Sequence, residues 1–224
     1  TMDVEVTDNE SPTITCQNDI VQNTDTGLCQ AFVTVPTLTI FENCAIASVT
    51  NDYNGTSDAT DIYVEGTTTV VWTVIDIHGN VSTCSMNITI TDNQAPDFTC
   101  PAVLSQAADL GSCDAVVTMP AVTATDNCGV ASIVNDYTGT DDASAIYTIG
   151  TTTITWTITD IHGNVSQCTQ DITITDDESP ILTCPADLTE LVDSNCEFVV
   201  LDYTSLAVVT DNCDTDVMLT QSPV

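Results

Sequence analysis

The sequence has no lysine and no arginine in 224 residues, against 33 aspartate and glutamate residues, so its formal net charge is −33. Without a basic patch the chain cannot attract nucleic acid or an anionic membrane surface. Salt bridges are restricted to the two histidines in protonated form, and a lysine–asparagine isopeptide crosslink is excluded. The carboxylates must therefore lie in water, take up protons or bind cations.

Other features are scarce, and each scarcity excludes a class of protein. The apolar runs are strand-sized, so no membrane span is visible, and no signal peptide is recognisable. The 9 glycines and 8 prolines fall between these runs. No nucleophile–base pair, phosphate-binding loop or open metal triad is present, so the sequence predicts that the protein is not an enzyme.

Valine, isoleucine and threonine dominate what is present, within an apolar fraction of 42% that argues against disorder. These β-branched residues favour strands. In residues 66–76, alternation puts Val70, Trp72, Val74 and Asp76 on one face of a strand. The pattern predicts an all-β fold with Trp72 and its counterpart Trp156 in the core.

One stretch of sequence occurs three times at equal intervals, at 4–16, 88–100 and 172–184. This period is too long for a solenoid unit and fits a small sandwich domain. We predict tandem immunoglobulin-like antiparallel β-sandwiches: residues 1–10 as the last strand of a preceding repeat, 11–92 and 93–176 as complete repeats, and 177–224 as the first half of a third. We interpret the chain as a slice of a longer array; a strand-exchanging fibre subunit is the alternative.

The 11 cysteines follow the same period without CxxC pairs, which predicts disulfides in an oxidising compartment; a zinc site is the alternative. In the predicted sandwich, the loop before the third strand and the last turn lie at the end where the chain enters. This geometry favours Cys44–Cys84 and Cys128–Cys168, although four cysteines per repeat allow three connectivities. The remaining pairs would be Cys16–Cys29, Cys100–Cys113 and Cys184–Cys196, with Cys213 unpaired.

Each repeat opens with T-C or T-C-P and carries a D-N-C loop (E-N-C at 42–44), and each complete one ends as in GTTTVVWTVIDIHGNVSTC, residues 66–84. This combination resembles the hyalin repeat, the HYR module of extracellular adhesive proteins, over essentially the whole chain. The resemblance implies an immunoglobulin-like sandwich, tandem arrays on cell surfaces or in extracellular matrix, a role in adhesion, and no catalytic residues. Trp72 and Trp156 stand where many members have Tyr or Phe, and Glu42 where Asp is usual.

The repeated stretch T-D-N-x-x-P is also similar to the Ca²⁺-binding linkers of cadherins. A physical argument for Ca²⁺ binding does not depend on this similarity. Oxygen-bearing side chains converge at one end of the predicted sandwich, and no Lys or Arg is there to neutralise them. Ca²⁺ takes six to eight such oxygen ligands. The alternative is that they are ordinary turn residues capping their own backbone. The predicted Ca²⁺ ligands are Asp92, Asn93, Asp126, Asn127, Asp160 and Asn164 at the middle hinge; Asp8, Asn9, Glu10, Asn43, Asp76 and Asn80 at the first; and Asp176, Asp177, Glu178, Asp211 and Asn212 at the last.

Three further sets of side chains carry weaker signals. His78 and His162 lie in the D-I-H-G-N turns, either facing solvent or sensing pH. Asn9, Asn54, Asn80, Asn87 and Asn164 fit the N-x-[ST] glycosylation pattern. Tyr53, Tyr63, Tyr137 and Tyr147 recur at the period as packing residues or as a recognition surface.

The leading functional hypothesis is an extracellular or cell-surface adhesive protein, a disulfide-stabilised rod stiffened by Ca²⁺ at its hinges. The alternative is a carbohydrate- or protein-binding module that uses its loops. A third hypothesis is a polymeric surface filament. The expected partners are neighbouring repeats, copies of the chain in a fibre, and a protein or glycan of unknown identity, but neither nucleic acid nor the membrane interior.

Overall fold

The computed structural model describes residues 2–222, and within this range it confirms the all-β prediction with eighteen strands and one short 3₁₀ turn, η1 (Thr204–Leu206). No helix among these residues is both long and apolar enough to cross a membrane. The first repeat contains β1 (Thr13–Thr15), β2 (Ile20–Asn23), β3 (Gln30–Val33), β4 (Thr39–Phe41), β5 (Ile46–Asn51), β6 (Asp61–Val64), β7 (Gly66–Asp76) and β8 (Val81–Thr91).

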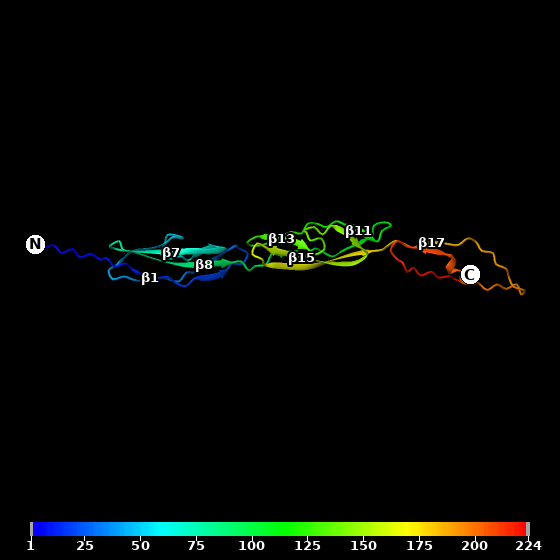
Figure 1. The fold of residues 1–224 in the computed structure, drawn as a ribbon, viewed down its shortest axis with the longest axis horizontal. Coiled ribbons are helices and arrows are strands. Elements are labelled where there is room, and N and C mark those ends of the chain that lie inside the picture. The colour runs from blue at the N-terminus through cyan, green and yellow to red at the C-terminus, as the bar shows by residue number, and fades with distance from the viewer. Residues whose placement is uncertain (1, 223–224) are drawn as a thin grey trace. The chain divides into compact units, whose positions relative to one another are not determined.

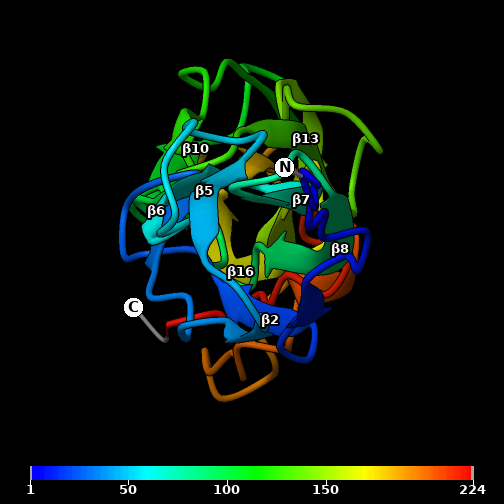
Figure 2. The ribbon, with the colours of Figure 1, turned by 90° about the vertical axis from the view of Figure 1, so that its left-hand side faces the viewer.

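The first repeat is built on a four-stranded sheet with the order β2-β8-β7-β5, accompanied by the pairs β1-β4 and β3-β6. The long strands β7 and β8 lie side by side over their paired positions, from Gly66–Ile90 to Ile75–Val81 (Figure 1). In the end-on view the labels β5, β7, β8 and β2 follow one another around the sheet (Figure 2).

One pairing in each complete repeat departs from a purely antiparallel sandwich. β2 runs parallel to β8, with Ile20 opposite Ile88 and Asn23 opposite Thr91. Parallel neighbours need a long crossover connection, and here most of the repeat lies between the two strands. As a result β2 and β8 reach the hinge together, and the Thr24 N–H donates to the Thr91 carbonyl at 3.0 Å.

The core of the first repeat follows the predicted alternation. Val70, Trp72, Val74 and Asp76 are all buried on one face of β7. Trp72 packs with Tyr63, Met86 and Ile88, as a core residue. The Trp72 indole Nε1–H donates to the Ser57 carbonyl at 3.3 Å, which satisfies its one polar group.

Two of the four repeated tyrosines, Tyr63 and Tyr147, lie in the cores. Tyr63 is fully buried; its hydroxyl donates to the Ala59 carbonyl, and burial raises its pKa to about 12. Tyr53 stacks on Tyr63 with ring centroids 4.3 Å apart, and Tyr137 stacks on Tyr147 at 4.5 Å. Tyr63 and Tyr147 are therefore packing residues, whereas Tyr53 and Tyr137 are exposed, at 39% and 45%.

The second repeat reproduces the first. Its four-stranded sheet has the order β10-β16-β15-β13, accompanied by β11-β14 and β9-β12. In the third repeat β17 pairs with β18. The strands are β9 (Asp97–Phe98), β10 (Leu104–Ala107), β11 (Asp114–Val117), β12 (Ala124–Thr125), β13 (Val130–Asn135), β14 (Ala145–Thr148), β15 (Gly150–Asp160), β16 (Val165–Thr175), β17 (Ile181–Thr183) and β18 (Val208–Thr210).

Contacts divide the chain into two compact units whose limits differ from those of the sequence repeats. One unit contains Thr1–Phe98, Thr123–Ser132 and Ile158–Ser166; the other contains Thr99–Val122, Ile133–Thr157 and Gln167–Val224. The two loops of the second repeat that approach the middle hinge therefore belong to the same unit as the first repeat. The predicted limits at 10, 92 and 176 stay a prediction.

The predicted disulfide pairing is wrong. Within each repeat the bridge joins the cysteine after the hinge to the cysteine of the last long strand: Cys16–Cys84 and Cys100–Cys168. The other bridges join successive repeats: Cys29–Cys128 and Cys113–Cys213, so Cys213 is bonded. Among the described residues Cys44, Cys184 and Cys196 are free thiols. The physical reason is the register of β8: Cys84 faces Trp72, in the interior, where Cys16 also packs.

Candidate functional site

The turn after each long strand is organised by one buried aspartate. Asp160, at the end of β15, accepts the N–H groups of His162 and Asn164 on Oδ1 at 2.8 Å and the Asn164 amide on Oδ2 at 2.7 Å. Burial raises the pKa of Asp160, but the hydrogen bonds from Asn164, His162 and Gly163 outweigh it and hold the pKa below its ordinary value. Gly163 has φ +90°, which the tight turn requires.

Asp76 organises the matching turn of the first repeat. Its Oδ1 accepts the N–H groups of His78 and Asn80 at 2.8 Å, and its Oδ2 accepts the Asn80 amide at 2.6 Å. Here too burial acts against the hydrogen bonds, and the pKa of Asp76 is lowered. Both carboxylates are therefore ionised and fixed in orientation.

At the middle hinge three elements bring carboxylates together. Asp92 follows β8, Asp126 lies in the loop between β12 and β13, and Asp160 ends β15. One oxygen from each lies within 4.8 Å of the others. Two carboxylates at such a distance repel by about 1 kcal/mol in water and about 4 kcal/mol near a protein surface. No lysine or arginine exists in the chain to offset this repulsion.

Several oxygens in this cluster are buried without a hydrogen-bond donor. The Asp92 side chain is 0% exposed, and its Oδ2 has no hydrogen-bond partner. Asp126 Oδ2 and Asn127 Oδ1 are also buried and also have no hydrogen-bond partner. The other oxygen of this carboxylate, Asp126 Oδ1, accepts hydrogen bonds from the N–H groups of Cys128 and Gly129, both at 2.9 Å. Buried oxygens without donors are costly, and Ca²⁺ is a ligand that would satisfy them.

The first hinge repeats the cluster with one substitution. Asp8, Glu42 and Asp76 place one carboxylate oxygen each within 4.8 Å of the others, and Asp8 Oδ2 is buried without a hydrogen bond. The longer Glu42 therefore supplies the oxygen that Asp126 supplies in the second repeat. Glu42 was left out of the predicted ligands, although its place one repeat before Asp126 was the signal that identifies it.

Asp8 and Asp92 each belong to a second group as well, which contains a histidine and a cysteine. His78 Nδ1 lies 3.6 Å from Asp8 Oδ2, and His162 Nδ1 lies 3.3 Å from Asp92 Oδ2. His162 Nε2 in addition lies 3.2 Å from Glu65 Oε1. The hydrogen bond with the Asp8 carboxylate, partial desolvation and the surrounding negative charge raise the pKa of the exposed Cys44 thiol. Whether either histidine senses pH stays a prediction.

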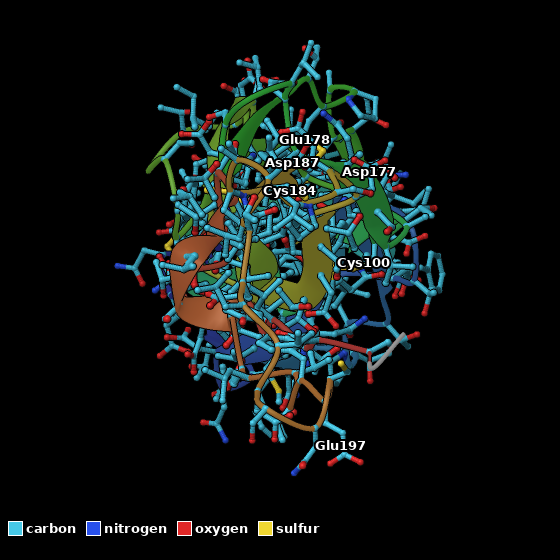
Figure 3. All side chains as sticks on the ribbon, turned by 90° about the vertical axis from the view of Figure 1, so that its right-hand side faces the viewer. Cys100, Asp177, Glu178, Cys184, Asp187 and Glu197 are labelled. Carbon is cyan, nitrogen blue, oxygen red and sulfur yellow. A yellow bond between two sulfur atoms is a disulfide. The ribbon has the colours of Figure 1, made fainter. Side chains whose placement is uncertain are left out.

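The last hinge does not bring its carboxylates together. Asp176 and Asp177 are exposed, and no metal-sized cluster forms among the described residues there. Asp211 Oδ1 instead accepts the N–H groups of Asp214 and Cys213, which lower its pKa. The carboxylates of Asp177, Glu178 and Asp187 are labelled in Figure 3. Asn9 and Asn93, of the other two hinges, are exposed.

A second structural device accompanies the hinges: a joint that links successive repeats. Beside the Cys29–Cys128 bridge, the Asn127 amide donates to the Leu28 carbonyl at 3.1 Å and to Asp92 Oδ1 at 3.1 Å. The hinge residue Gln94 accepts the Gly27 N–H on Oε1 at 2.8 Å. The sequence-based predictions did not include this joint.

The joint recurs one repeat further along. Beside the Cys113–Cys213 bridge, the Asn212 amide donates to the Ser112 carbonyl at 3.1 Å and to Glu178 Oε2 at 2.7 Å. Glu178 also accepts the Gly111 N–H at 2.8 Å. The bridge, the asparagine bond to the carbonyl before the turn cysteine and the glycine N–H bond to the hinge side chain occur in both joints, so they are a property of the repeat.

The glycosylation sites stay predictions, but the structure separates them. Asn80 and Asn164 use their side-chain amides on Asp76 and Asp160, so a glycan there would remove a contact of the turn. Asn54 donates to the Asp58 carbonyl, and Asn87 lies against Asp19. Asn9 is exposed.

Comparison with known proteins places these features in a family. The model of the HYR domain matches residues 7–90 and 91–174. Hyalin of Strongylocentrotus purpuratus is 31% identical over 214 residues, covering 92% of this chain and 17% of that protein. Hyalin of Lytechinus variegatus is 29% identical over 143 residues, covering 62% of this chain and 26% of that protein. The chain thus spans less than a third of the curated relatives that it matches.

Solved structures show more distant similarity. The protocadherin GammaB4 extracellular domain is 15% identical with a TM-score of 0.35, covering 78% of this chain and 34% of that one. The titin domains Z1Z2 in complex with telethonin are 11% identical with a TM-score of 0.38, covering 78% of this chain and all of that one.

The two matched segments cover most of the chain and meet at the middle hinge, where the acidic cluster and the joint lie. Four disulfides and tandem sandwiches complete the pattern. The chain belongs to the HYR domain family and is an extracellular protein built from tandem repeats.

Proposed function

We propose that the chain is a segment of a Ca²⁺-dependent adhesive array in which each complete hinge binds a calcium ion. The observation that carries this proposal is the set of buried oxygens without donors at the middle hinge: Asp92 Oδ2, Asp126 Oδ2 and Asn127 Oδ1. Asp160 adds a third carboxylate within 4.8 Å. Such hard oxygen ligands suit Ca²⁺, and bound water molecules would complete its coordination shell of six to eight oxygens.

The ion would act on the array by joining elements of successive repeats. Asp92 comes from the end of the first repeat, whereas Asp126 and Asp160 come from loops of the second. An ion held by all three cancels their mutual repulsion and restricts the hinge. The first hinge offers Asp8, Glu42 and Asp76 in the same way. Asn43, Asn80 and Asn164 are proposed as further ligands beside these carboxylates.

Calorimetry on the folded chain tests the proposal. We expect Ca²⁺ uptake by chain that has been freed of metal with a chelator, and loss of the middle-hinge site in Asp126→Asn. Asp141→Asn is the matched control, since Asp141 is an exposed aspartate outside the hinges and its loss removes the same charge. Absence of uptake, or an equal effect of the two variants, would contradict the proposal. Circular dichroism in chelator establishes that both variants are folded.

Self-association into a filament has separate support. The cross-strand pair Phe32–Ile62 on the β3-β6 sheet is exposed, at 54% and 46%, and its counterpart Val116–Ile146 is exposed at 61% and 57%. Because these exposed apolar pairs occupy equivalent positions in successive repeats, they offer a lateral contact surface between copies of the chain. Sedimentation of Phe32→Thr with Val116→Thr, compared with the unchanged chain, tests this part; equal association would contradict it.

A carbohydrate- or protein-binding surface has less support. The tyrosines that would form it are stacked in pairs, and the Tyr53 hydroxyl already donates to the Ile62 carbonyl at 2.6 Å.

A further inference from the structure

Cys44 occupies the position of two cysteines that close disulfides between repeats. Cys128 is the counterpart of Cys44 one repeat later and is bonded to Cys29; Cys213, in the D-N-C loop of the third repeat, is bonded to Cys113. Cys44 is exposed and is a free thiol among the described residues. Wherever this chain contains a turn cysteine in the repeat before the loop, the loop cysteine is bonded to it.

Cys196 is the complementary thiol. Its turn aligns with those of Cys29 and Cys113 because Asp25, Asp109 and Asp193 open the three turns at equal intervals along the chain. Asp25 and Asp109 donate their N–H groups to the carbonyls of Gln30 and Asp114, and Asp193 donates to that of Glu197. The third turn is therefore one residue shorter. Cys196 is exposed, and the neighbouring Glu197 points away from the other labelled side chains (Figure 3).

The surroundings of Cys44 match those of the bonded loop cysteine Cys213. The Asn43 amide donates to Glu10 Oε2 at 3.0 Å, as the Asn212 amide donates to Glu178 Oε2 at 2.7 Å. In the formed joints the asparagine also donates to the carbonyl before the turn cysteine, and the hinge side chain also accepts a glycine N–H. Asn43 and Glu10 therefore present the donor and acceptor that an incoming turn uses.

We propose that Cys44 is an attachment site for the turn cysteine of another HYR repeat, and that between copies of this chain the attached residue is Cys196 of a second copy. The product is a head-to-tail covalent chain of copies. In a longer polypeptide a preceding repeat offers the same thiol chemistry, and the bond formed is of the same kind.

The bond forms by thiol–disulfide exchange with a small disulfide such as oxidised glutathione. One cysteine thiolate attacks a glutathione sulfur, which releases one glutathione thiolate and leaves a mixed disulfide. The second cysteine thiolate attacks the protein sulfur of that mixed disulfide and releases the second glutathione. Two protein thiols are oxidised to one disulfide, one glutathione disulfide is reduced to two thiols, and the two protons pass to the released thiolates.

The test is incubation of the chain in a glutathione redox buffer, followed by non-reducing electrophoresis and peptide mapping by mass spectrometry. We expect a ladder of oligomers linked by Cys44–Cys196. Cys44→Ser and Cys196→Ser should each abolish the ladder, whereas a mixture of the two variants should stop at a dimer because each contributes one thiol. Cys184→Ser is the matched control, since it removes a free thiol that has no part in the joint, and its ladder should persist.

Three outcomes would overturn the proposal: a chain that stays monomeric, a ladder that survives Cys44→Ser, or links that map to Cys184, including an internal Cys184–Cys196 bond. In an array containing further repeats, mapping of Cys44 to the turn cysteine of the preceding repeat would identify that source instead of a second copy. Insertion of a glycine after Ser194 restores the turn length of the first two repeats and should extend the ladder at a given glutathione ratio.

Discussion

The middle hinge at Asp92 and the last hinge at Asp176 share one device and differ in another. Both have a bridge from turn to loop, both have an asparagine that donates to the carbonyl before the turn cysteine, and both have a hinge side chain that accepts a glycine N–H. Among the described residues of these two hinges, only the middle one gathers three carboxylates.

The difference shows which parts of a repeat each device needs. The joint needs the turn of one repeat and the D-N-C loop of the next, and the first half of a repeat supplies that loop. The carboxylate cluster also needs the aspartate at the end of the long strand, such as Asp160, and the last hinge has no counterpart in these 224 residues. Joint and cluster are therefore separable in experiment.

The largest expected effect comes from removing the joints one at a time. Cys29→Ser with Cys128→Ser should lower the free energy of unfolding by about 4.7 kcal/mol, since the bridge closes a loop of about 100 residues. The Cys113–Cys213 bridge closes a loop of nearly the same length, but Cys113→Ser with Cys213→Ser should have less than half that effect. The reason is that the described residues after Ile174 contain no buried hydrophobic core. Calorimetric melting measures both, and equal losses would contradict the comparison.

Next in size is the response to calcium. At a free Ca²⁺ concentration about 100 times Kd, one bound ion should stabilise the folded chain by about 2.7 kcal/mol. Asp92→Asn should remove the contribution of the middle hinge, and Asp176→Asn, which loses the same charge at the corresponding position, should leave it intact. Melting in calcium and in chelator gives the two differences, and sensitivity to Asp176→Asn would mean that the last hinge binds the ion as well.

The asparagines of the joints should have smaller effects. Asn127→Ala removes an exposed bond to the Leu28 carbonyl and a part-buried bond to the Asp92 carboxylate, and should cost about 1–2 kcal/mol. Asn212→Ala removes exposed hydrogen bonds and should cost less than about 1 kcal/mol. Denaturant unfolding of each variant beside the unchanged chain measures these values; a larger loss at Asn212 would reverse the ranking of the hinges.

The smallest expected difference is in acid stability without calcium. Asp160 and Asp211 both have pKa values below the ordinary 3.8, so each stabilises the fold above pH 3.8 and loses this contribution as the pH falls through the lowered pKa. Asp160→Asn should flatten the acid limb of the stability curve more than Asp211→Asn, since Asp160 is buried and Asp211 is not. Melting from pH 5 to pH 2 in chelator tests this ranking.

The fold was predictable from sequence because alternation in the long strands determines which side chains face inward. Val70, Trp72 and Val74 could be placed in the core from their spacing alone. The grouping of Asp92, Asp126 and Asp160 was predictable for a related reason: each follows or precedes a strand whose end lies at the hinge. That Ca²⁺ binds there stays a prediction.

The disulfide pairing was not predictable because a regular repeat hides it. When the cysteines recur at nearly the same interval, Cys29 can bond with Cys44 of its own repeat or with Cys128 of the next, and the sequence looks the same in both cases. The choice is made by three-dimensional proximity: Cα atoms of Cys29 and Cys128 are 4.7 Å apart. The parallel pairing of β2 with β8 was hidden for a similar reason, since the two strands lie at opposite ends of the repeat.

The bridge from Cys16 to Cys84, repeated as Cys100–Cys168, has a mechanical consequence. If the array is pulled, force enters at Cys16, crosses the bridge to Cys84 and leaves along residues 84–100 to the next bridge. Even with every sandwich unfolded, each repeat could then lengthen only to about 55 Å, against about 280 Å for a fully extended repeat without bridges. The chain would behave as a tether of nearly fixed length that resists stretching at its covalent bonds.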